Sequence, residues 1–522
     1  MSDVTAQQLM YPLPQQQHIS GRLWALTRQC LLAVTLAMGC QSALAQAMYR
    51  IKPLGYLGGC TSTTPYIEAL NEAGQATGQA CNAHGDLHAF LWKNDGSPMV
   101  DLGPDEVGST SNGIAISPSG VAAGSATDST GSFAFASSGS GAPMTRIYNT
   151  LGGSEIAAFA VNNLGQLTGY ATTGGLRYFQ HAFVWKNDGS PLLDLGIDAF
   201  DYSYGNAINA AGTVAATSGA STERFNEGFI WKNDGTPIIW LHAATADFMN
   251  KSGQVTGIDS DAWRHNAYLW SNDGTQINLG TLGGYASWPL ALNDAGQVAG
   301  SSYVVRFIRP HAFVWLNDGT PMRNLGTFGG SESQANDLND SGQVTGYANI
   351  AGNSASHAFL WRNDGTKIQD LNALLDPGDP LKPYITLTSG AFIDNAGDIV
   401  ADGIDGRTGE FARYLLQGTV LTLTPRSLAF GSQRISTASS AKSVTVTNTG
   451  LKVVPITSIV LIGSAASQFA STNNCGSSMV GHATCTIKVT FKPTTKGAKS
   501  ATLNVNGGGG GLRTVALTGT GT

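Results

Sequence analysis

The chain has 522 residues, of which 66 are Gly, 19 are Pro and 12% are charged. That length allows two or three domains, and the charged fraction is about half that of a typical soluble intracellular domain. The formal net charge of −6 comes without a basic stripe or an acidic tail, which excludes nucleic acid as a partner. Aromatic residues and short alternating apolar runs are spread along the chain, which excludes general disorder.

The N-terminus is typical of a secretory signal peptide. Two arginines precede the apolar run at residues 30–39, which is too short to span a bilayer, and small residues follow up to Ala45. We therefore expect residues 1–45 to be removed by cleavage after Ala45, which leaves no membrane span. An uncleaved anchor and a lipoprotein attached through Cys40 are the alternatives. The expected location is secreted, at the cell surface or in the periplasm of a bacterium.

The chain has six cysteines, two of them inside the segment expected to be removed. The other four are Cys60, Cys81, Cys475 and Cys485, and an even number in an oxidising compartment predicts disulfides. Cys475 and Cys485 lie ten residues apart in one loop-and-strand region, so we predict their pairing. Cys60 is predicted to pair with Cys81, although no feature of the sequence shows that their Cα atoms come within bonding range. There is no Cys-x-x-Cys pair, so a thiolate zinc site has no support.

One motif, His-Ala-Phe-Leu-Trp-Lys-Asn-Asp-Gly, recurs along most of the chain. Its copies and close variants lie at residues 88–96, 181–189, 228–235, 266–274, 311–319 and 357–365, with degenerate copies at 132–135 and 411–415. Each of these eight copies follows a second motif related to Gly-Gln-Val-Thr-Gly, which recurs every 41 to 55 residues. That period is typical of a four-stranded propeller blade rather than of a helical pair.

The repeat contains the signals of four strands. His88, Phe90 and Trp92 share one face of a predicted strand while alanine and leucine share the other, so both faces must be covered. The Asn-Asp-Gly that follows is a tight-turn signal, and a returning strand and a loop come next. An Ala-x-x-Asn strand, an Asn-x-x-Gly turn and the Gly-Gln strand of the second motif complete the four strands. The equivalent scaffold positions are His181, Phe183, Trp185, Trp231, Trp270, His311, Trp315, His357 and Trp361.

Four short antiparallel strands cannot bury both of their faces alone, so the copies must stack. Closure into a ring leaves only short, protected edges, and we predict a β-propeller of about eight four-stranded blades over residues 46–417, with seven blades as the alternative. A linear solenoid is the rival arrangement. Against it, the array starts with a returning-strand copy at residues 49–55 and ends at residues 411–416 with the adjoining part of that hairpin, so the two ends could pair.

Residues 418–522 carry a different pattern. Its alternating apolar runs, about seven in this segment, predict an immunoglobulin-like β-sandwich. The whole chain is therefore predicted to be all-β.

With these motifs, the repeats resemble the HAF family of probable extracellular repeats, which is named for the His-Ala-Phe triplet. The resemblance covers about residues 49–416. The segments 444–448, Val-Thr-Val-Thr-Asn, and 485–491, Cys-Thr-Ile-Lys-Val-Thr-Phe, are similar to the choice-of-anchor D or ASH-type domain, an immunoglobulin-like sandwich of bacterial surface proteins. The resemblance implies an exported repeat protein and assigns no activity or binding residue. The second and eighth copies lack both the His and the Trp of the motif.

The sequence has few motifs that indicate catalysis or ligand binding. It has no Gly-x-Ser-x-Gly elbow, no His-Glu-x-x-His, no P-loop and no dinucleotide fingerprint. The four repeat histidines belong to different blades on a wide ring, and one Asn-Asp-Gly turn offers too few oxygen ligands for calcium. We therefore predict no catalytic residue, no metal and no cofactor.

The sequence leaves two hypotheses for the function. The first is an exported, non-enzymatic surface or secreted protein, a binding, adhesion or structural scaffold whose ligand is an unknown glycan, matrix component or protein. The alternative is a carbohydrate-active hydrolase or lyase with its site in the propeller channel, supplied by carboxylates from several blades. Charged residues clustered in the channel would favour the alternative.

Overall fold

A computed structural model describes residues 49–522, so the predicted signal peptide lies outside the described residues. The gaps in this range are 59, 61–64, 138–143, 176–178, 197–201, 220–225, 242–244, 262–263, 306–308, 419–420, 449–453, 481–482 and 508–511. The described residues are almost entirely β-structure, which confirms the predicted fold class. Their helices are α2 (Leu371–Leu374) and the 3-10 turns η1 (Ala351–Asn353) and η2 (Ala466–Gln468). None of the described helices has the length and apolar character needed to cross a membrane.

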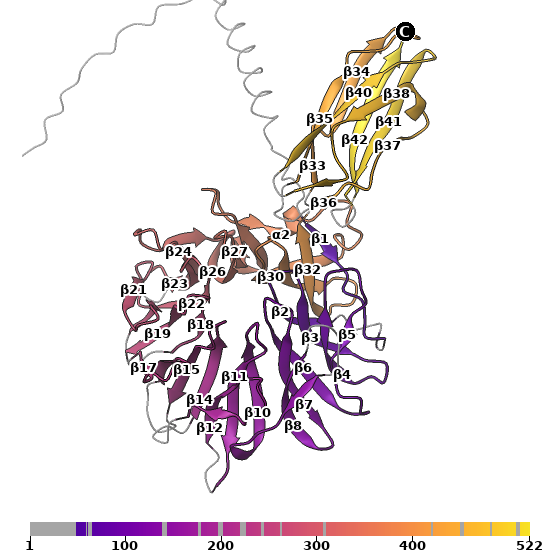
Figure 1. The fold of residues 1–522 in the computed structure, drawn as a ribbon. Coiled ribbons are helices and arrows are strands. Elements are labelled where there is room, and N and C mark those ends of the chain that lie inside the picture. The colour runs from indigo at the N-terminus through magenta and orange to yellow at the C-terminus, as the bar shows by residue number, and fades with distance from the viewer. Residues whose placement is uncertain are drawn as a thin grey trace, which may run out of the picture. The chain divides into compact units, whose positions relative to one another are not determined.

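Eight four-stranded antiparallel blades follow one another in chain order around a ring (Figure 1). Blades one and two are β2 (Tyr66–Leu70), β3 (Ala76–Cys81), β4 (Leu87–Trp92) and β5 (Val100–Asp101), then β6 (Thr110–Ile116), β7 (Ala122–Asp128), β8 (Gly131–Ala136) and β9 (Thr145–Ile147). Blades three and four are β10 (Gly152–Val161), β11 (Leu167–Thr173), β12 (Gln180–Trp185) and β13 (Leu193–Asp194), then β14 (Tyr202–Ile208), β15 (Val214–Gly219), β16 (Asn226–Trp231) and β17 (Ile239–Trp240). A single parallel pair, Gln180 with Tyr202, joins the sheets of blades three and four.

The remaining blades repeat the same order of strands. Blades five and six are β18 (Phe248–Met249), β19 (Val255–Asp261), β20 (Arg264–Trp270) and β21 (Gln276–Gly280), then β22 (Ser287–Leu292), β23 (Val298–Tyr303), β24 (Pro310–Trp315) and β25 (Arg323–Gly326). Blade seven is β26 (Gly329–Leu338), β27 (Val344–Ile350), β28 (Ser356–Trp361) and β29 (Gln369–Asp370), and blade eight is β30 (Ile385–Ile393), β31 (Ile399–Asp405), β32 (Phe411–Gly418) and β1 (Tyr49–Lys52).

The ring closes through the N-terminal strand. β1 pairs antiparallel with β32, so that Tyr49 lies opposite Gly418 and Lys52 opposite Leu415. The outer strand of blade eight is therefore supplied by the start of the propeller segment. This pairing confirms the predicted closure, and the eight blades confirm the higher of the two predicted blade counts.

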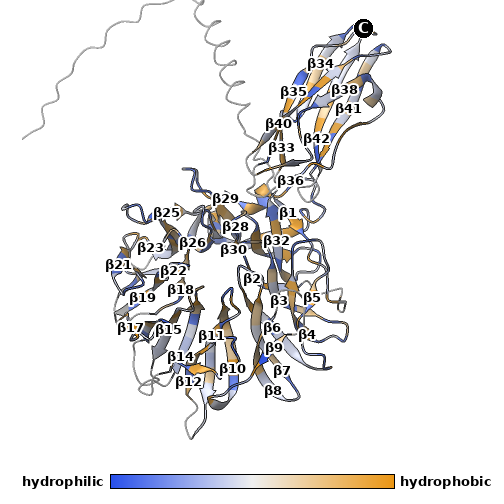
Figure 2. Cartoon of the chain, in the orientation of Figure 1, coloured by the Kyte–Doolittle hydropathy of each residue, from blue (hydrophilic) through white to orange (hydrophobic). Residues whose placement is uncertain are grey.

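The two faces of each His-Ala-Phe strand pack against different blades. In blade seven, Phe359 and Trp361 share a core cluster with Ala312 and Val314 of blade six. The aromatic face thus packs on the preceding blade, while the small aliphatic face receives the aromatic side chains of the next one. In Figure 2 hydrophobic residues accordingly lie along the strands. The phenylalanines of the motif are fully buried: Phe90, Phe183, Phe229, Phe313 and Phe359.

The C-terminal segment is a sandwich of two four-stranded sheets. Its strands are β33 (Leu421–Thr424), β34 (Ser427–Gln433), β35 (Lys442–Asn448), β36 (Val454–Pro455), β37 (Ser458–Ile462), β38 (Phe469–Asn473), β39 (Ser478–Met479), β40 (Thr484–Phe491), β41 (Gly497–Asn506) and β42 (Leu512–Gly521). One sheet has the order β33-β35-β40-β38 and the other β34-β42-β41-β37. The inward residues of both sheets alternate with exposed ones and form a single core, as an immunoglobulin-like sandwich requires.

Both predicted disulfides are present. Cys475 and Cys485 have their Cα atoms 5.1 Å apart, and Cys60 and Cys81 have theirs 5.6 Å apart. The second bond ties the loop before β2 to the end of β3.

Candidate functional site at the channel mouth

Each inner strand of the propeller ends in a tight Asn-x-x-Gly turn. In blade one, Oδ1 of Asn71 accepts hydrogen bonds from the N–H groups of Ala73 at 3.0 Å and Gln75 at 2.9 Å. The N–H of Gly74 closes the turn on the carbonyl of Asn71, and its φ of 71° is one that glycine adopts without strain. The same turn recurs at Ser117, Asn162, Asn209, Asn250, Asn293, Asn339 and Asp394.

These turns also join neighbouring blades. The side-chain amide of Asn71 donates to the carbonyl of Ser117 at 2.9 Å, and Asn293 donates to the carbonyl of Asn339 at 2.9 Å. Equivalent bonds run from Asn162, Asn250 and Asn339 to the next blade. Because these amides are buried, their bonds fix the turns beside one another around the axis.

The residue that follows each turn Asn, or its Ser or Asp equivalent, is therefore held at the end of the channel. These eight residues, which we call the channel mouth, are Glu72, Pro118, Asn163, Ala210, Lys251, Asp294, Asp340 and Asn395. They line a cavity of about 310 Å³. Four of them are charged, and each charged residue comes from a different blade.

The charged side chains of the channel mouth converge. Nζ of Lys251 lies 2.9 Å from Oε1 of Glu72 and 2.6 Å from Oδ2 of Asp294. Asp340 accepts the N–H of Asp294 at 2.9 Å and the amide of Asn395 at 2.7 Å. The carboxylate oxygens of Glu72, Asp294 and Asp340 all lie within 4.8 Å of one another.

The ammonium of Lys251 neutralises part of this negative charge. Burial by itself lowers the pKa of Lys251, but the hydrogen bonds and charges of Asp294 and Glu72 outweigh burial and raise that pKa above its ordinary value. Lys251 is therefore a fixed cation at neutral pH. The three carboxylates have the oxygen ligands that Ca²⁺ prefers, but Ca²⁺ takes six to eight oxygens and Lys251 already contacts two of the carboxylates. We assign them no metal.

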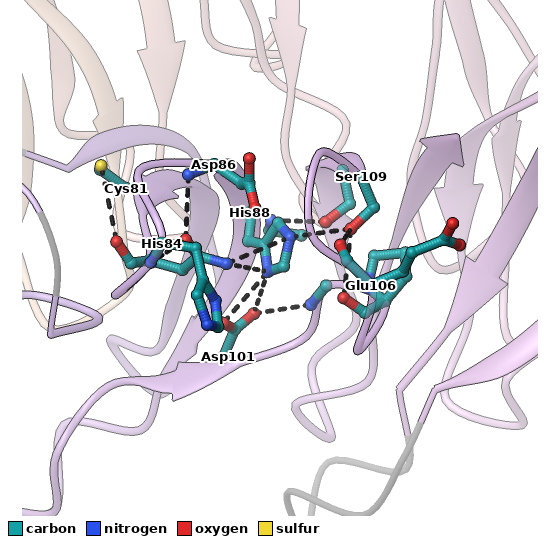
Figure 3. A network of polar contacts seen from close by, with 12 residues as sticks. Cys81, His84, Asp86, His88, Asp101, Glu106 and Ser109 are labelled. Atoms are coloured by element: carbon teal, nitrogen blue, oxygen red, sulfur yellow. Dashed lines mark hydrogen bonds and ion pairs between the residues drawn. The ribbon is translucent and has the colours of Figure 1, made fainter. Parts of the chain in front are cut away.

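The repeat histidines occupy separate blades and do not converge. Nδ1 of His88 lies 2.9 Å from Oδ1 of Asp101, whose same oxygen accepts the N–H of Gly103 at 2.7 Å (Figure 3). His181 and His357 make the equivalent contact to an aspartate in their own blades, and His311 makes it to Asn324. Each histidine thus ties the start of its strand to the end of the neighbouring outer strand.

The four charged residues of the channel mouth were not found from the sequence. The sequence pattern identified the Asn-x-x-Gly turn as a turn but not as a link between blades. A signal was available: if the eight turns are aligned, the position after the Asn, or after its Ser or Asp equivalent, is charged in four blades.

No family model matches the chain, and no curated protein matches it. Several solved structures are similar. The β-propeller domain of the trilobed protease from Pyrococcus furiosus aligns over 60% of this chain and 99% of that chain, with 11% identity and a TM-score of 0.38. Dipeptidyl peptidase 4 from Porphyromonas gingivalis aligns over 78% and 69%, with 10% identity and a TM-score of 0.42. A puromycin hydrolase aligns over 69% of this chain and 61% of its own length, with 14% identity and a TM-score of 0.38.

At these identities the likeness is one of fold. Several of the similar structures are peptidases, and this finding corrects the predicted non-enzymatic scaffold and the prediction that the chain is no enzyme. The physical reason for the error is that a motif search tests residues close together in the sequence. A propeller instead gathers charged residues from distant turns, as it does with Glu72 and Lys251.

Proposed function

We propose that the chain is an extracytoplasmic hydrolase that acts on a polysaccharide, with its site at the channel mouth. The observation that carries the proposal is the convergence of Glu72, Asp294 and Asp340 with Lys251 in the cavity of about 310 Å³. A concave site with convergent charged groups is where a propeller most readily holds a ligand.

The spacing of the carboxylates supports hydrolysis through a covalent intermediate. Glycosidases that retain configuration hold their two carboxyl groups about 5 Å apart, whereas inverting enzymes leave room for a water between them. The oxygens of Glu72 and Asp340 lie within 4.8 Å, which fits the shorter spacing. A glycosidic bond placed between them is therefore within reach of both groups.

We assign the nucleophile to Glu72, because a carboxylate in an ion pair with Lys251 has no proton to give, and the acid and base to Asp340. Two hydrogen bonds, from Asn395 and from the backbone of Asp294, hold the carboxyl group of Asp340 in place. Glu72 attacks the anomeric carbon while Asp340, in its acid form, gives its proton to the leaving oxygen as the glycosidic bond breaks. Water then hydrolyses the glycosyl ester on Glu72 and returns a proton to Asp340. Lys251 screens the negative charge of the site.

The location and the family are proposals too. Two disulfides fit an oxidising compartment, and the signal segment predicted at residues 1–45 supports export. The six close copies of the motif support membership of the HAF group, and the C-terminal sandwich supports an ASH-type domain.

The test is release of reducing ends from a panel of bacterial and plant polysaccharides by the purified protein. We expect Glu72→Gln and Asp340→Asn each to lower the rate at least about 100-fold, the range that general acid–base groups contribute. Asp95→Asn, at an exposed Asn-Asp-Gly turn, is the matched control and should keep the rate. If the protein cleaves peptides in place of polysaccharides, the proposed substrate class is wrong. If it cleaves neither of them, the proposed hydrolase activity is wrong.

A further inference from the structure

A second constellation lies between blades one and two, outside the channel mouth. Nε2 of His88 lies 3.1 Å from Oγ of Ser109, and Nδ1 of the same ring lies 2.9 Å from Oδ1 of Asp101 (Figure 3). A hydroxyl, an imidazole and a carboxylate joined in this order form the arrangement that activates a serine for attack. We propose that Ser109 is an activated serine nucleophile, with His88 as its base and Asp101 as the group that orients His88.

Two strands of blade one and the start of blade two build this site. His88 is in β4, Asp101 ends β5, and Ser109 directly precedes β6. Gly103 is required between them, because a Cβ at this position would lie 2.0 Å from Nδ1 of His88. The side-chain amide of Asn82 also lies 3.3 Å and 3.4 Å from the two ring nitrogens. The ring is thus held from both sides in one orientation.

The contact between the histidine and a serine hydroxyl is not repeated in the other blades, as far as the structure describes them. His181 keeps the aspartate contact, but its Nε2 is buried without a hydrogen-bond partner. Among the described residues, His88 is the one repeat histidine with a serine hydroxyl within hydrogen-bond distance of Nε2. The histidine and its acidic partner suffice to tie two strands together, and Ser109 adds a hydroxyl that lies between Nε2 of His88 and the carbonyls of Pro104 and Glu106.

The chemistry is acyl or phosphonyl transfer to Ser109. Its Oγ forms a bond to the electrophilic carbon or phosphorus while His88 takes the hydroxyl proton at Nε2. The leaving alkoxide, amine or fluoride departs with that proton. In the acyl case a water then attacks the ester, His88 takes its proton, and Oγ of Ser109 recovers a proton as the acid leaves.

A loop covers the site in this structure. Ser109 is 2% exposed and His88 is 3% exposed, beneath the loop of residues 103–108. Oε2 of Glu106 accepts hydrogen bonds from the N–H and the hydroxyl of Ser129 at 3.2 Å and 3.0 Å, and the carbonyl of Glu106 accepts the hydroxyl of Ser109 at 2.6 Å. In this closed arrangement the proton of the Ser109 hydroxyl is therefore donated to a loop carbonyl and not to His88. The loop has glycine at both ends, so opening at these two positions exposes the hydroxyl and frees its proton to turn to Nε2 of His88.

The protonation of His88 sets the pH at which Ser109 reacts. Burial lowers the pKa of His88, but the hydrogen bond and charge of Asp101, with the charge of Asp86 and a bond at Ser109, outweigh burial and raise it. A protonated ring cannot accept the hydroxyl proton. Reaction at Ser109 should therefore increase as the pH rises through this raised pKa.

The experiment is labelling of the purified protein with a fluorophosphonate probe, with the adduct mapped by mass spectrometry. We expect one adduct, on Ser109, that is absent from Ser109→Ala and from denatured protein. Asp101→Asn should fold, because His311 pairs with Asn324 in blade six, and should label at least about tenfold more slowly. Glu106→Ala frees the loop from Ser129 and should label faster.

Ser97→Ala, at an exposed turn, is the control and should label as the unaltered protein does. Three results would overturn the proposal. They are an adduct on another serine, equal labelling of Asp101→Asn and the unaltered protein, or no adduct on either the unaltered protein or Glu106→Ala.

Discussion

Lys251 of blade five forms an ion pair with Glu72 of blade one, with Nζ and Oε1 2.9 Å apart, although 179 residues separate them in the sequence. The same ammonium contacts Asp294 at 2.6 Å. One cation therefore connects turns from three blades at the end of the channel. A surface lysine without a structural role would not form ion pairs with carboxylates of two other blades.

Lys251→Met should leave the three carboxylates of the channel mouth without their cation. Lys251 is 54% exposed, so the lost ion pairs should lower the free energy of unfolding by about 1 kcal/mol or less. The remaining repulsion is electrostatic, and about 1 M NaCl should remove most of the difference. Thermal unfolding at low and high salt measures this.

Lys488→Met is the control, because Lys488 is an exposed residue of the C-terminal sandwich. It should leave the unfolding temperature unchanged at either salt concentration. A loss for Lys251→Met that is as large in high salt as in low salt would mean that packing, and not charge, explains the role of Lys251.

Asn293→Ala should break the link between blades six and seven. The variant removes the donor to the carbonyl of Asn339 and the acceptor of the N–H groups of Ala295 and Gln297. Since these groups are buried or partly buried, we expect a loss of at least about 2 kcal/mol, measured by urea unfolding.

Asn293→Asp separates the two roles of this side chain. It keeps the acceptor of the turn, as Asp394 does in blade eight, and loses the donor between blades. Its stability should lie between that of the unaltered protein and that of Asn293→Ala. Equal losses for the two variants would show that the bonds donated by the amide, to Asn339 and to Gln297, carry the whole effect.

The fold was predictable because it depends on local patterns that recur along the sequence. The alternation in the strand of His88, Phe90 and Trp92 required cover on both faces, and the structure supplies it from two blades. The split hairpin at the two ends of the array predicted the closure, seen in the pairing of Ile51 with Leu416. Each of these features depends on a few neighbouring residues.

The channel mouth was not predictable in this way, because Lys251 and Glu72 meet only after all blades have been placed in the ring. The partner of each repeat histidine is an intermediate case. An Asp or Asn lies 13 residues after His88, His181, His311 and His357, and this regular spacing was available in the sequence. The contact of Ser109 with His88 depends on the path of one loop and left no repeated signal.

Asp379→Ala should weaken the closure of the ring. Asp379 is buried, and its carboxylate accepts the N–H of Ile51 in β1 at 2.7 Å and the N–H of Leu381 at 2.9 Å. Loss of both acceptors leaves two N–H groups unpaired and should cost about 2 kcal/mol. Hydrogen exchange should show the loss first at β1 and β32. Uniform destabilisation of all eight blades would contradict a local role for Asp379.

Asp337 should make the stability of the propeller depend on pH. Burial raises the pKa of Asp337 from 3.8 to about 7, although its oxygens accept the N–H groups of Ile393 at 2.8 Å and Leu338 at 2.9 Å. Since the folded chain holds this proton more tightly than the unfolded chain does, the stability is greatest below about pH 3.8 and falls as the pH rises to about 7. Above that pH this group adds no further change.

Asp337→Asn should remove this pH dependence, because an amide does not titrate in this range. Blade six has Ala291 at the equivalent position before its last inner-strand leucine, so the fold does not need a carboxylate there, and Asp337→Ala should fold as well. Urea unfolding from pH 4 to pH 8 should show a fall for the unaltered protein that is reduced in both variants. An equal fall in all three proteins would assign the pH dependence to other groups, since Asp337 is the one position that differs among them.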